Sequence, residues 1–302
     1  MNVLVLYTSP PPSVAQGRVT DEFDVSEAAR SVASVLPRAV LAAVRGEPRE
    51  ILAALATHTP DVVYNLCEAP LGRAALEPHA AALFELAGVR FTGSGSETLA
   101  LCRRKDRTSA VLAAAGVPVP NAGSCFPCFV KPADQDGSVG IVHESVCEDE
   151  DALKRARLRL DGPVIVEEFL PGREFAVALW GRSEPDHASV GEMLFAGGMR
   201  AITYAAKWES ASPDFANTPV TYTVDLEAPL RAGVLDAARS AWRAVGARGY
   251  LRVDIRLDAW ERPKVIDVNP NCETAPGVGI HRAVVEAGWT WERFVRAQVE
   301  WA

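Results

Sequence analysis

The fold is decided by two short stretches near the C-terminus, LRVDI at 251–255 and VIDVNP at 265–270. Polar residues alternate with apolar ones in both, a pattern that predicts two β-strands. The polar segment 258–263 between them predicts a hairpin loop. Because side chains two residues apart lie on the same face of a strand, Arg252 and Asp254 share a face, and so do Asp267 and Asn269. The hairpin is therefore expected to present oxygen ligands beside an arginine.

The oxygen atoms of Asp254, Asp267 and Asn269 are ligands of the kind that Mg²⁺ prefers, and Mg²⁺ is typically shared with substrate phosphates. The alternative is an antiparallel hairpin whose polar face is merely solvated. Leu, Val and Ile flank these charges closely, which a solvated face explains poorly. The sequence therefore favours a metal site.

The composition limits the classes of partner. The chain has 302 residues, of which 48% are hydrophobic and 23% are charged, as in an ordinary soluble globular protein. A net charge of −8 argues against nucleic acid or an anionic membrane as the main partner. No apolar run reaches membrane-spanning length, and the N-terminus lacks the features of a signal peptide. We therefore expect a cytoplasmic protein.

The six cysteines are scattered along the chain. Cys125 and Cys128 have CxxC spacing, but no second pair completes a zinc site. This spacing predicts two half-buried cysteines, with a redox pair as the alternative.

Lysine usage points to phosphate. The chain contains 26 arginines but only five lysines, so a lysine kept in a special position indicates that a compact ammonium is needed there. Lys131 ends a predicted strand, 129–132, directly before the glycine-bearing segment 134–140. Glycine lets backbone N–H groups approach phosphate oxygens, and these residues therefore predict a phosphate-binding loop.

The N-terminal part alternates predicted strands with predicted helices. Strands are expected at 3–7, 40–44, 61–66 and 89–92, and helices at 22–36, 48–58 and 74–87. This order predicts a parallel sheet, and ligands of such sheets collect at the C-terminal ends of the strands. Ser9, Glu22 and Glu68 are therefore expected near a site.

The rest of the chain follows a boundary at 93–95. One helix is expected over 97–115, carrying Lys105, and another over 149–160. Further expectations, in chain order, are strands at 164–170 and 174–180, an irregular polar segment at 196–222, a long helix at 226–245 and a terminal helix at about 280–300.

In this order the motifs resemble the ATP-grasp superfamily, and specifically D-alanine–D-alanine ligase and its relatives. The resemblance covers nearly the whole chain. It is carried by NLCE (65–68), FTGS (91–94), Lys105, AGVPVP (115–120), VKP (130–132), GSVGI (137–141), 167–175, RVD (252–254), DVN (267–269) and PG (276–277). It implies an α/β (α+β) class, with an N-terminal Rossmann-like pre-ATP-grasp domain (1–93), a central ATP-grasp subdomain (94–171) and a C-terminal ATP-grasp subdomain (172–302).

The resemblance also implies an ATP site. Lys105 and Lys131 would hold the α- and β-phosphates, with Ser138 in the phosphate-binding loop, and Lys207 would reach the γ-phosphate. Two Mg²⁺ ions, or Mn²⁺ in their place, would bind to Asp254, Asp267 and Asn269, and Arg252 would stabilise an oxyanion. The remaining nucleotide contacts would come from Glu167, Glu168, Phe169 and Leu170 to adenine, and from Glu174 to ribose.

The amino-acid half of the implied site departs from the family. Glu22 matches the glutamate that holds the first substrate, but the Gly-Gly-x-Ser that normally precedes it is SPPP (9–12) here. The first loop serine is Gly137, and the tyrosine after the γ-phosphate lysine is Trp208, so neither can supply a hydroxyl. The remaining alternative for Glu22 is an acid near the start of a helix.

The C-terminal motif is longer than in the family by a few residues. Gly277 and Trp208 are expected, from the resemblance, to lie at the substrate. Arg282 falls close to where the family binds the carboxylate of the second substrate, although a helix-surface arginine is an equal alternative. His281 is expected to be structural. Glu273 contacts a substrate amine or caps the following turn, and the sequence assigns no role to Cys272.

The activity implied is ATP-dependent joining of two amino acids, or of an amino acid and another amine, through an acyl phosphate. The expected substrates are small molecules, and they need not include D-alanine. The resemblance also implies that the protein forms a homodimer. Two alternatives are the housekeeping D-alanine–D-alanine ligase and a catalytically silent nucleotide-binding protein. A Rossmann-type cofactor enzyme is excluded because no Gly-x-Gly-x-x-Gly follows the first strand.

Overall fold

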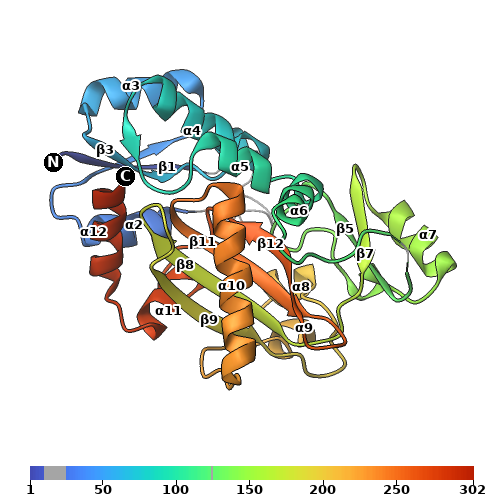
Figure 1. Cartoon of the computed structure of the whole chain (residues 1–302). Helices are drawn as coiled ribbons and strands as arrows, with labels where there is room; N and C mark the ends of the chain where they lie inside the picture. Colours follow the sequence, from blue (N-terminus) through green and yellow to red (C-terminus); the bar gives the residue numbers. More distant parts are fainter. Residues whose placement is uncertain (10–24, 124) are drawn as a thin grey trace.

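The structure is a computed structural model that describes residues 1–9, 25–123 and 125–302 (Figure 1). Glu22 and the SPPP segment beyond Ser9 therefore lie outside the described residues. The described chain forms three sheets with helices packed around them, and each sheet is drawn from its own part of the sequence.

The first sheet is parallel, as predicted. Its strands are β1 (Val3–Thr8), β2 (Val40–Val44), β3 (Val62–Leu66) and β4 (Arg90–Phe91), in the order β2-β1-β3-β4. The helices between them are α2 (Ser26–Ser34), α3 (Pro48–His58) and α4 (Glu77–Leu86). Strand β3 is buried along its whole length because both faces of the sheet are covered, which is typical of parallel sheets.

The second sheet has three strands in the order β6-β5-β7, namely β5 (Cys128–Pro132), β6 (Val146–Cys147) and β7 (Val164–Glu168). Helix α7 (Glu150–Arg159) packs against it. This helix begins where the side chain of Asp149 accepts a hydrogen bond from the backbone N–H of Ala152. Its acidic first turn and basic last turn both suit the helix dipole.

The third sheet holds the predicted hairpin. Five antiparallel strands run in the order β10-β9-β8-β11-β12, namely β8 (Glu174–Gly181), β9 (His187–Met193), β10 (Val220–Thr221), β11 (Gly249–Leu257) and β12 (Pro263–Asn269). Asp254 lies opposite Asp267 and Arg252 opposite Asn269. The alternation in the sequence thus predicted both the strands and the shared polar face.

Helix α10 (Ala228–Val245) covers one face of the third sheet (Figure 1). Its buried residues recur at helical spacing, from Val234 through Ala238 and Trp242 to Val245. The helix ends at Gly246, whose left-handed conformation (φ 65°) closes the last turn. The polar side chains of the β11–β12 hairpin lie on the opposite face of the sheet, which α10 does not cover.

Two predicted helices are each broken in two. The helix expected over 97–115 is α5 (Ser96–Cys102) and α6 (Lys105–Ala114). Arg104 between them is extended, and the backbone N–H of Lys105 donates to Ala133 O instead of continuing the helix. Arginine carries no stop signal, so this break depends on tertiary contacts.

The expected terminal helix is α11 (Gly279–Glu286) followed by α12 (Trp291–Trp301). Gly288 in the link has φ 82°, and Thr290 caps α12 by accepting from the N–H of Arg293. Here the sequence did carry break signals, a glycine and a capping threonine. Both helices pack beneath the first sheet and share its core with Trp180 (Figure 1).

The segment expected to be irregular, 196–222, contains α8 (Tyr204–Trp208), α9 (Pro213–Ala216) and β10. Each helix is short and is capped by the preceding hydroxyl residue, Thr203 or Ser212. The prediction for the cysteines was also wrong. Cys125 is exposed and Cys128 is fully buried opposite Cys147, and the six cysteines are free thiols.

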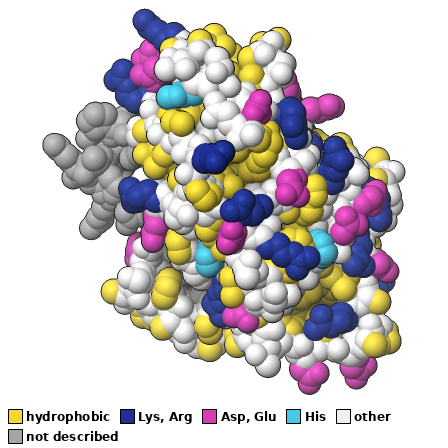
Figure 2. All heavy atoms as spheres, turned by 90° about the vertical axis from the view of Figure 1, so that its left-hand side faces the viewer, with side chains coloured by type: hydrophobic (Ala, Val, Ile, Leu, Met, Phe, Trp, Pro, Cys, Tyr) yellow, Lys and Arg dark blue, Asp and Glu magenta, His cyan; other side chains and the backbone are white. Residues whose placement is uncertain are grey.

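Within the described residues, no helix combines the length and the apolar character needed to cross a bilayer. Figure 2 shows the side of the molecule that carries both chain ends, where acidic and basic side chains are interspersed with apolar ones.

Candidate active site

A cavity of about 760 Å³ lies between the second and third sheets, a size typical of small-molecule sites. Its wall brings together most of the residues singled out from the sequence, although they come from distant segments. These residues are Lys105, Lys131, Ser138, Glu167, Glu168, Phe169, Leu170, Glu174, Lys207, Arg252, Asp254, Asp267 and Arg282.

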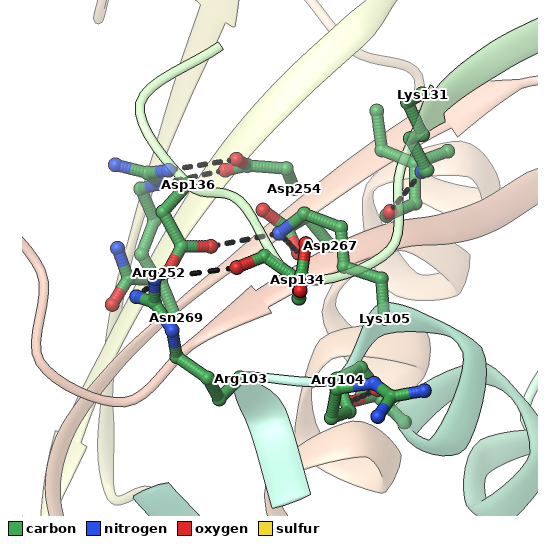
Figure 3. Close-up of polar contacts among 12 residues, drawn as sticks. Arg103, Arg104, Lys105, Lys131, Asp134, Asp136, Arg252, Asp254, Asp267 and Asn269 are labelled. Carbon is green, nitrogen blue, oxygen red and sulfur yellow. Dashed lines mark hydrogen bonds and ion pairs between the residues drawn. The ribbon is translucent and has the colours of Figure 1, made fainter. Parts of the chain in front are cut away.

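Arg252 and Asp254 form a two-pronged ion pair on the polar face of β11. The guanidinium Nε and Nη2 atoms donate to the two oxygens of Asp254 at 2.7 and 2.8 Å (Figure 3). The charge of Asp254 raises the pKa of Arg252 further above its usual range. Arg252 is thus a fixed positive charge in the cavity wall.

Lys105 connects the hairpin to residues 134–140, the predicted phosphate-binding loop. Its ammonium donates to Asp267 Oδ1 and to Asp136 Oδ1, each at 2.8 Å, and Arg103 donates to the other oxygen of Asp136 at 2.6 Å (Figure 3). Burial alone would lower the pKa of Lys105, but Asp267 and Asp136 outweigh burial and raise it. Burial alone would raise the pKa of Asp267, but Lys105 and Lys131 outweigh burial and lower it.

The phosphate-binding loop turns sharply at Gly137 and Ser138. Both have left-handed backbones, with φ of 64° and 59°. Glycine adopts this conformation freely, whereas serine is strained there, and such strain gathers at functional sites. The turn places Ser138 in the cavity wall.

At the other end of the cavity, acidic side chains are paired with cations. Lys131 forms an ion pair with Glu167 at 2.7 Å and donates to Ile266 O at 2.9 Å. Lys264 forms an ion pair with Glu168. Because the Glu168 side chain is already paired with Lys264, the backbone groups of 168–170 are better placed than this side chain to form hydrogen bonds with the edge of a planar ring.

Glu174 is buried against Arg256, whose Nη1 donates to it at 3.1 Å. Burial raises the pKa of Glu174, and Arg256 only partly opposes the rise. The guanidinium of Arg256 lies over the rings of Phe169 and Phe195, 5.2 and 4.8 Å from their centroids. Arg256 was not singled out from the sequence, because an arginine on a strand carries no distinguishing signal among 26.

Among the described cations of the cavity wall, Lys207 is the one without a carboxylate partner. Among the described residues it forms no ion pair, and its ammonium lies 5.5 Å from the ring centroid of Trp208. Lys207 lines the cavity although the residue as a whole is exposed, and desolvation together with the charge of Arg252 lowers its pKa. An anion entering the cavity would relieve this unfavourable arrangement.

Arg282 and Tyr222 form a separate part of the wall. The Arg282 guanidinium lies over the Tyr222 ring at 5.1 Å from its centroid, and Arg282 donates to Val220 O at 3.3 Å. Tyr222 packs closely on Gly191, since a Cβ at that glycine would lie 3.2 Å from the tyrosine ring. Arg282 lines the cavity, and it also forms an ion pair at 3.8 Å with Glu286, one turn further along α11.

Asn269, Gly277 and Trp208 are not in the cavity wall. The side-chain oxygen of Asn269 accepts a hydrogen bond from the N–H of Asn271 at 3.0 Å. The N–H of Gly277 donates to His281 Nδ1 at 3.2 Å, which gives His281 a structural contact. Trp208 points to the phosphate-binding loop, where its indole donates to Gly137 O.

Two further residues near the hairpin have defined places. Glu273 caps its own turn by accepting from the N–H of Ala275 at 2.8 Å. Cys272 is buried in the cavity wall, and burial raises its pKa to about 12. Cys272 is therefore a neutral thiol at physiological pH.

The polar face of the hairpin carries oxygen ligands of the kind that Mg²⁺ binds. Within the described residues, no three His, Cys, Asp or Glu side chains form a cluster that could hold a metal ion by themselves. Asp254 and Asp267 lie side by side in register, however, and one or two carboxylates plus substrate phosphates are the usual ligands of Mg²⁺. The donor set therefore fits Mg²⁺ that arrives with a nucleotide, and Arg252 and Lys105 balance the carboxylates without it.

The family model described as D-ala D-ala ligase C-terminus matches residues 116–300. The chain belongs to this family. This match confirms the family expected from the sequence, and the matched range contains every described residue of the cavity wall except Lys105.

Individual relatives of the family extend the match over the N-terminal part. The protein named uncharacterized protein y4sG from Sinorhizobium fredii is 29% identical, over 94% of this chain and 86% of its own length. A D-alanine–D-alanine ligase from Chromohalobacter salexigens is 30% identical over 67% of this chain and 65% of its own. The crystal structure of the Bacillus anthracis D-alanine–D-alanine ligase complexed with ATP has a TM-score of 0.76, covers 99% of this chain and 96% of that one, and is 17% identical, which shows the shared fold.

Asp136, Tyr222 and Arg256 are cavity residues that the sequence analysis missed. Of these, Asp136 could have been found, since it directly precedes Gly137 in a loop expected to bind phosphate. Its negative charge there is tolerated because Arg103 and Lys105 both pair with it.

Glu77 provides a pH-dependent prediction beside the cavity. Burial and the charge of Asp136 raise its pKa from 4.5 to about 7, against the opposing effects of Asn271 and Arg103. Because the folded state holds this proton more tightly, the stabilisation is complete below pH 4.5 and is lost as the pH rises through 7. We expect the free energy of unfolding to fall by up to about 3 kcal/mol over this range from this group.

Urea unfolding at pH 5, 6, 7 and 8 measures the effect. Glu77→Gln should flatten the pH dependence, whereas Glu300→Gln, on the exposed side of α12, should leave it as in the wild type. An unchanged slope in Glu77→Gln would refute the assignment.

Proposed function

We propose that the chain is an ATP-dependent ligase that joins the carboxylate of one amino acid to the amine of a second amino acid or another amine. The observation that carries this proposal is the meeting of three lysines, Arg252 and the two hairpin carboxylates, Asp254 and Asp267, in one cavity. Phosphoryl transfer requires positioned cations more than it requires covalent help from the protein. The family membership supports the same reaction class.

In the proposed reaction, a substrate carboxylate oxygen attacks the γ-phosphorus of ATP, and the bond from that phosphorus to the β,γ-bridging oxygen breaks to release ADP. The amine then attacks the carbonyl carbon of the resulting acyl phosphate, loses a proton, and expels phosphate. Lys207, which lacks a carboxylate partner among the described residues, would bind the γ-phosphate, and Arg252 would face the oxyanion of the tetrahedral intermediate. Two Mg²⁺ ions at Asp254, Asp267 and Asn269 would neutralise phosphate charge.

For the nucleotide, Lys105, Lys131 and Ser138 are assigned to the α- and β-phosphates, the 167–170 strand end to adenine, and Glu174 to ribose. When phosphates enter, Lys105 must exchange a carboxylate partner for phosphate oxygen. The present contacts of Lys105 with Asp136 and Asp267 show that its ammonium can hold two anionic oxygens at once.

For the amino acids, Arg282 is assigned to a substrate carboxylate, because a guanidinium suits that group well. Glu22 remains the proposed partner of the first ammonium. A homodimer is likewise proposed, and light scattering that gives the mass of a single chain would refute it.

The test is phosphate release from Mg·ATP with D- and L-amino acids supplied singly and in pairs. We expect specific pairs to support turnover, with the C–N product identified by mass spectrometry. Equal use of D-alanine alone and of the best pair would support the housekeeping ligase instead. Absence of Mg²⁺-dependent turnover with every amino acid and pair would support a silent nucleotide-binding protein.

A further inference from the structure

Trp208 and Gly137 are hydrogen-bonded to each other, although neither has the side chain that the family resemblance associates with its position. The indole Nε1–H of Trp208 donates to the carbonyl oxygen of Gly137 at 2.7 Å. In the family pattern, these two positions hold a tyrosine and a serine joined through hydroxyl groups. Here both hydroxyls are absent, but the two positions are still connected.

The new contact uses different chemistry. An indole N–H is a donor only, and a backbone carbonyl is an acceptor that no side-chain substitution removes. Gly137 has φ 64°, a conformation that strains any other residue. Gly137 and Trp208 are therefore complementary. Gly137 permits the turn, and the indole of Trp208 reaches the carbonyl oxygen of Gly137.

Trp208 belongs to a segment that lies against the phosphate-binding loop. We call residues 203–216, which comprise α8 and α9, the lid. Two other contacts join the lid to the chain after Gly137. The N–H of Tyr204 donates to Ile141 O at 3.0 Å, and the ring of His143 is 3.1 Å from Asp214.

Lys207 is held beside this contact. It precedes Trp208 in the last turn of α8, and its ammonium lies over the Trp208 ring. Because Lys207 forms no ion pair among the described residues, carboxylates do not fix the position of its ammonium. The anchoring of Trp208 is the nearest restraint on it.

We propose that Trp208 is a positioning residue, which clasps the lid to the phosphate-binding loop through Gly137 O and thereby holds Lys207 over the cavity. The proposal rests on the proposed function in one respect, namely that the anion bound by Lys207 is the γ-phosphate of ATP. Loss of the clasp should therefore weaken binding of a nucleotide with a γ-phosphate more than binding of one without it.

The first measurement concerns the nucleotide-free protein and does not depend on any activity. Trp208→Phe removes the N–H but keeps an aromatic ring. Amide hydrogen exchange across α8 should accelerate by about fivefold, the effect of losing one neutral hydrogen bond. The control is Trp260→Phe in the β11–β12 loop, where the residue is 73% exposed. Unchanged exchange in Trp208→Phe would overturn the clasp.

The second measurement compares a non-hydrolysable ATP analogue with ADP, both with Mg²⁺, by calorimetry. In Trp208→Phe, the affinity for the analogue should fall by about fivefold and that for ADP by less than about twofold. An equal loss for both nucleotides would show general loosening of the site and overturn the positioning role. Failure of the wild type to bind either nucleotide would instead contradict the proposed function, while the exchange comparison would still decide whether the clasp exists.

Discussion

Arg252→Ala is expected to lower kcat by about 100- to 1000-fold while changing the dissociation constant of Mg·ATP by less than about threefold. The guanidinium is fixed in the cavity wall by two hydrogen bonds to Asp254, so it is already oriented before any substrate arrives. In the proposed reaction, such preorganised charge would act on the oxyanion of the tetrahedral intermediate and not on the bound nucleotide. The effect should therefore appear in turnover.

Arg252→Lys is the matched variant, since it keeps the charge but loses the planar fork that pairs with Asp254. We expect its kcat to lie between those of the wild type and the alanine variant. Thermal unfolding of both variants checks that Asp254, left with a poorer partner, does not unfold the hairpin. A greater loss of ATP affinity than of turnover would contradict the role given to Arg252.

Asp267→Asn is expected to have the second large effect, a loss of turnover on the order of a thousandfold. Asp267 is both a proposed Mg²⁺ ligand and the present partner of Lys105. Its neutralisation should remove the tightening of ADP binding by Mg²⁺. It should also strengthen metal-free ADP binding, because Lys105 is then released toward phosphate.

The change in ADP affinity should thus have opposite signs with and without Mg²⁺. A carboxylate with only a structural role would not produce this difference. Calorimetry of ADP binding, with Mg²⁺ and with a chelator, measures both. Asp151→Asn is the control, because that side chain is 79% exposed on α7. Continued tightening by Mg²⁺ in Asp267→Asn would exclude Asp267 as a ligand.

The hairpin could be predicted from the sequence because strand alternation is a local property. Alternating apolar residues fixed which side chains share a face, and the observed register pairs Asp254 with Asp267. The parallel first sheet was predictable for a similar reason, since its strands and helices alternate along the chain. The domain boundaries at 93 and 171 stay predictions.

Features that depend on contacts between distant segments could not be predicted. The break between α5 and α6 arises where Arg103 reaches Asp136 and where the N–H of Lys105 bonds to Ala133 O. The pairing of Glu174 with Arg256 likewise joins strands that are 82 residues apart. Trp208 was expected at the substrate, and only its hydrogen bond to Gly137 showed that it contacts the loop instead.

In the proposed reaction, a substrate carboxylate takes the γ-phosphoryl group of ATP. Amino acids that support turnover can be supplied with ¹⁸O in the carboxylate, and the released phosphate can be analysed by mass spectrometry. If an acyl phosphate forms and an amine displaces its phosphate, each phosphate molecule carries one ¹⁸O atom from the carboxylate. Phosphate that is released together with the C–N product but contains no ¹⁸O would contradict the account.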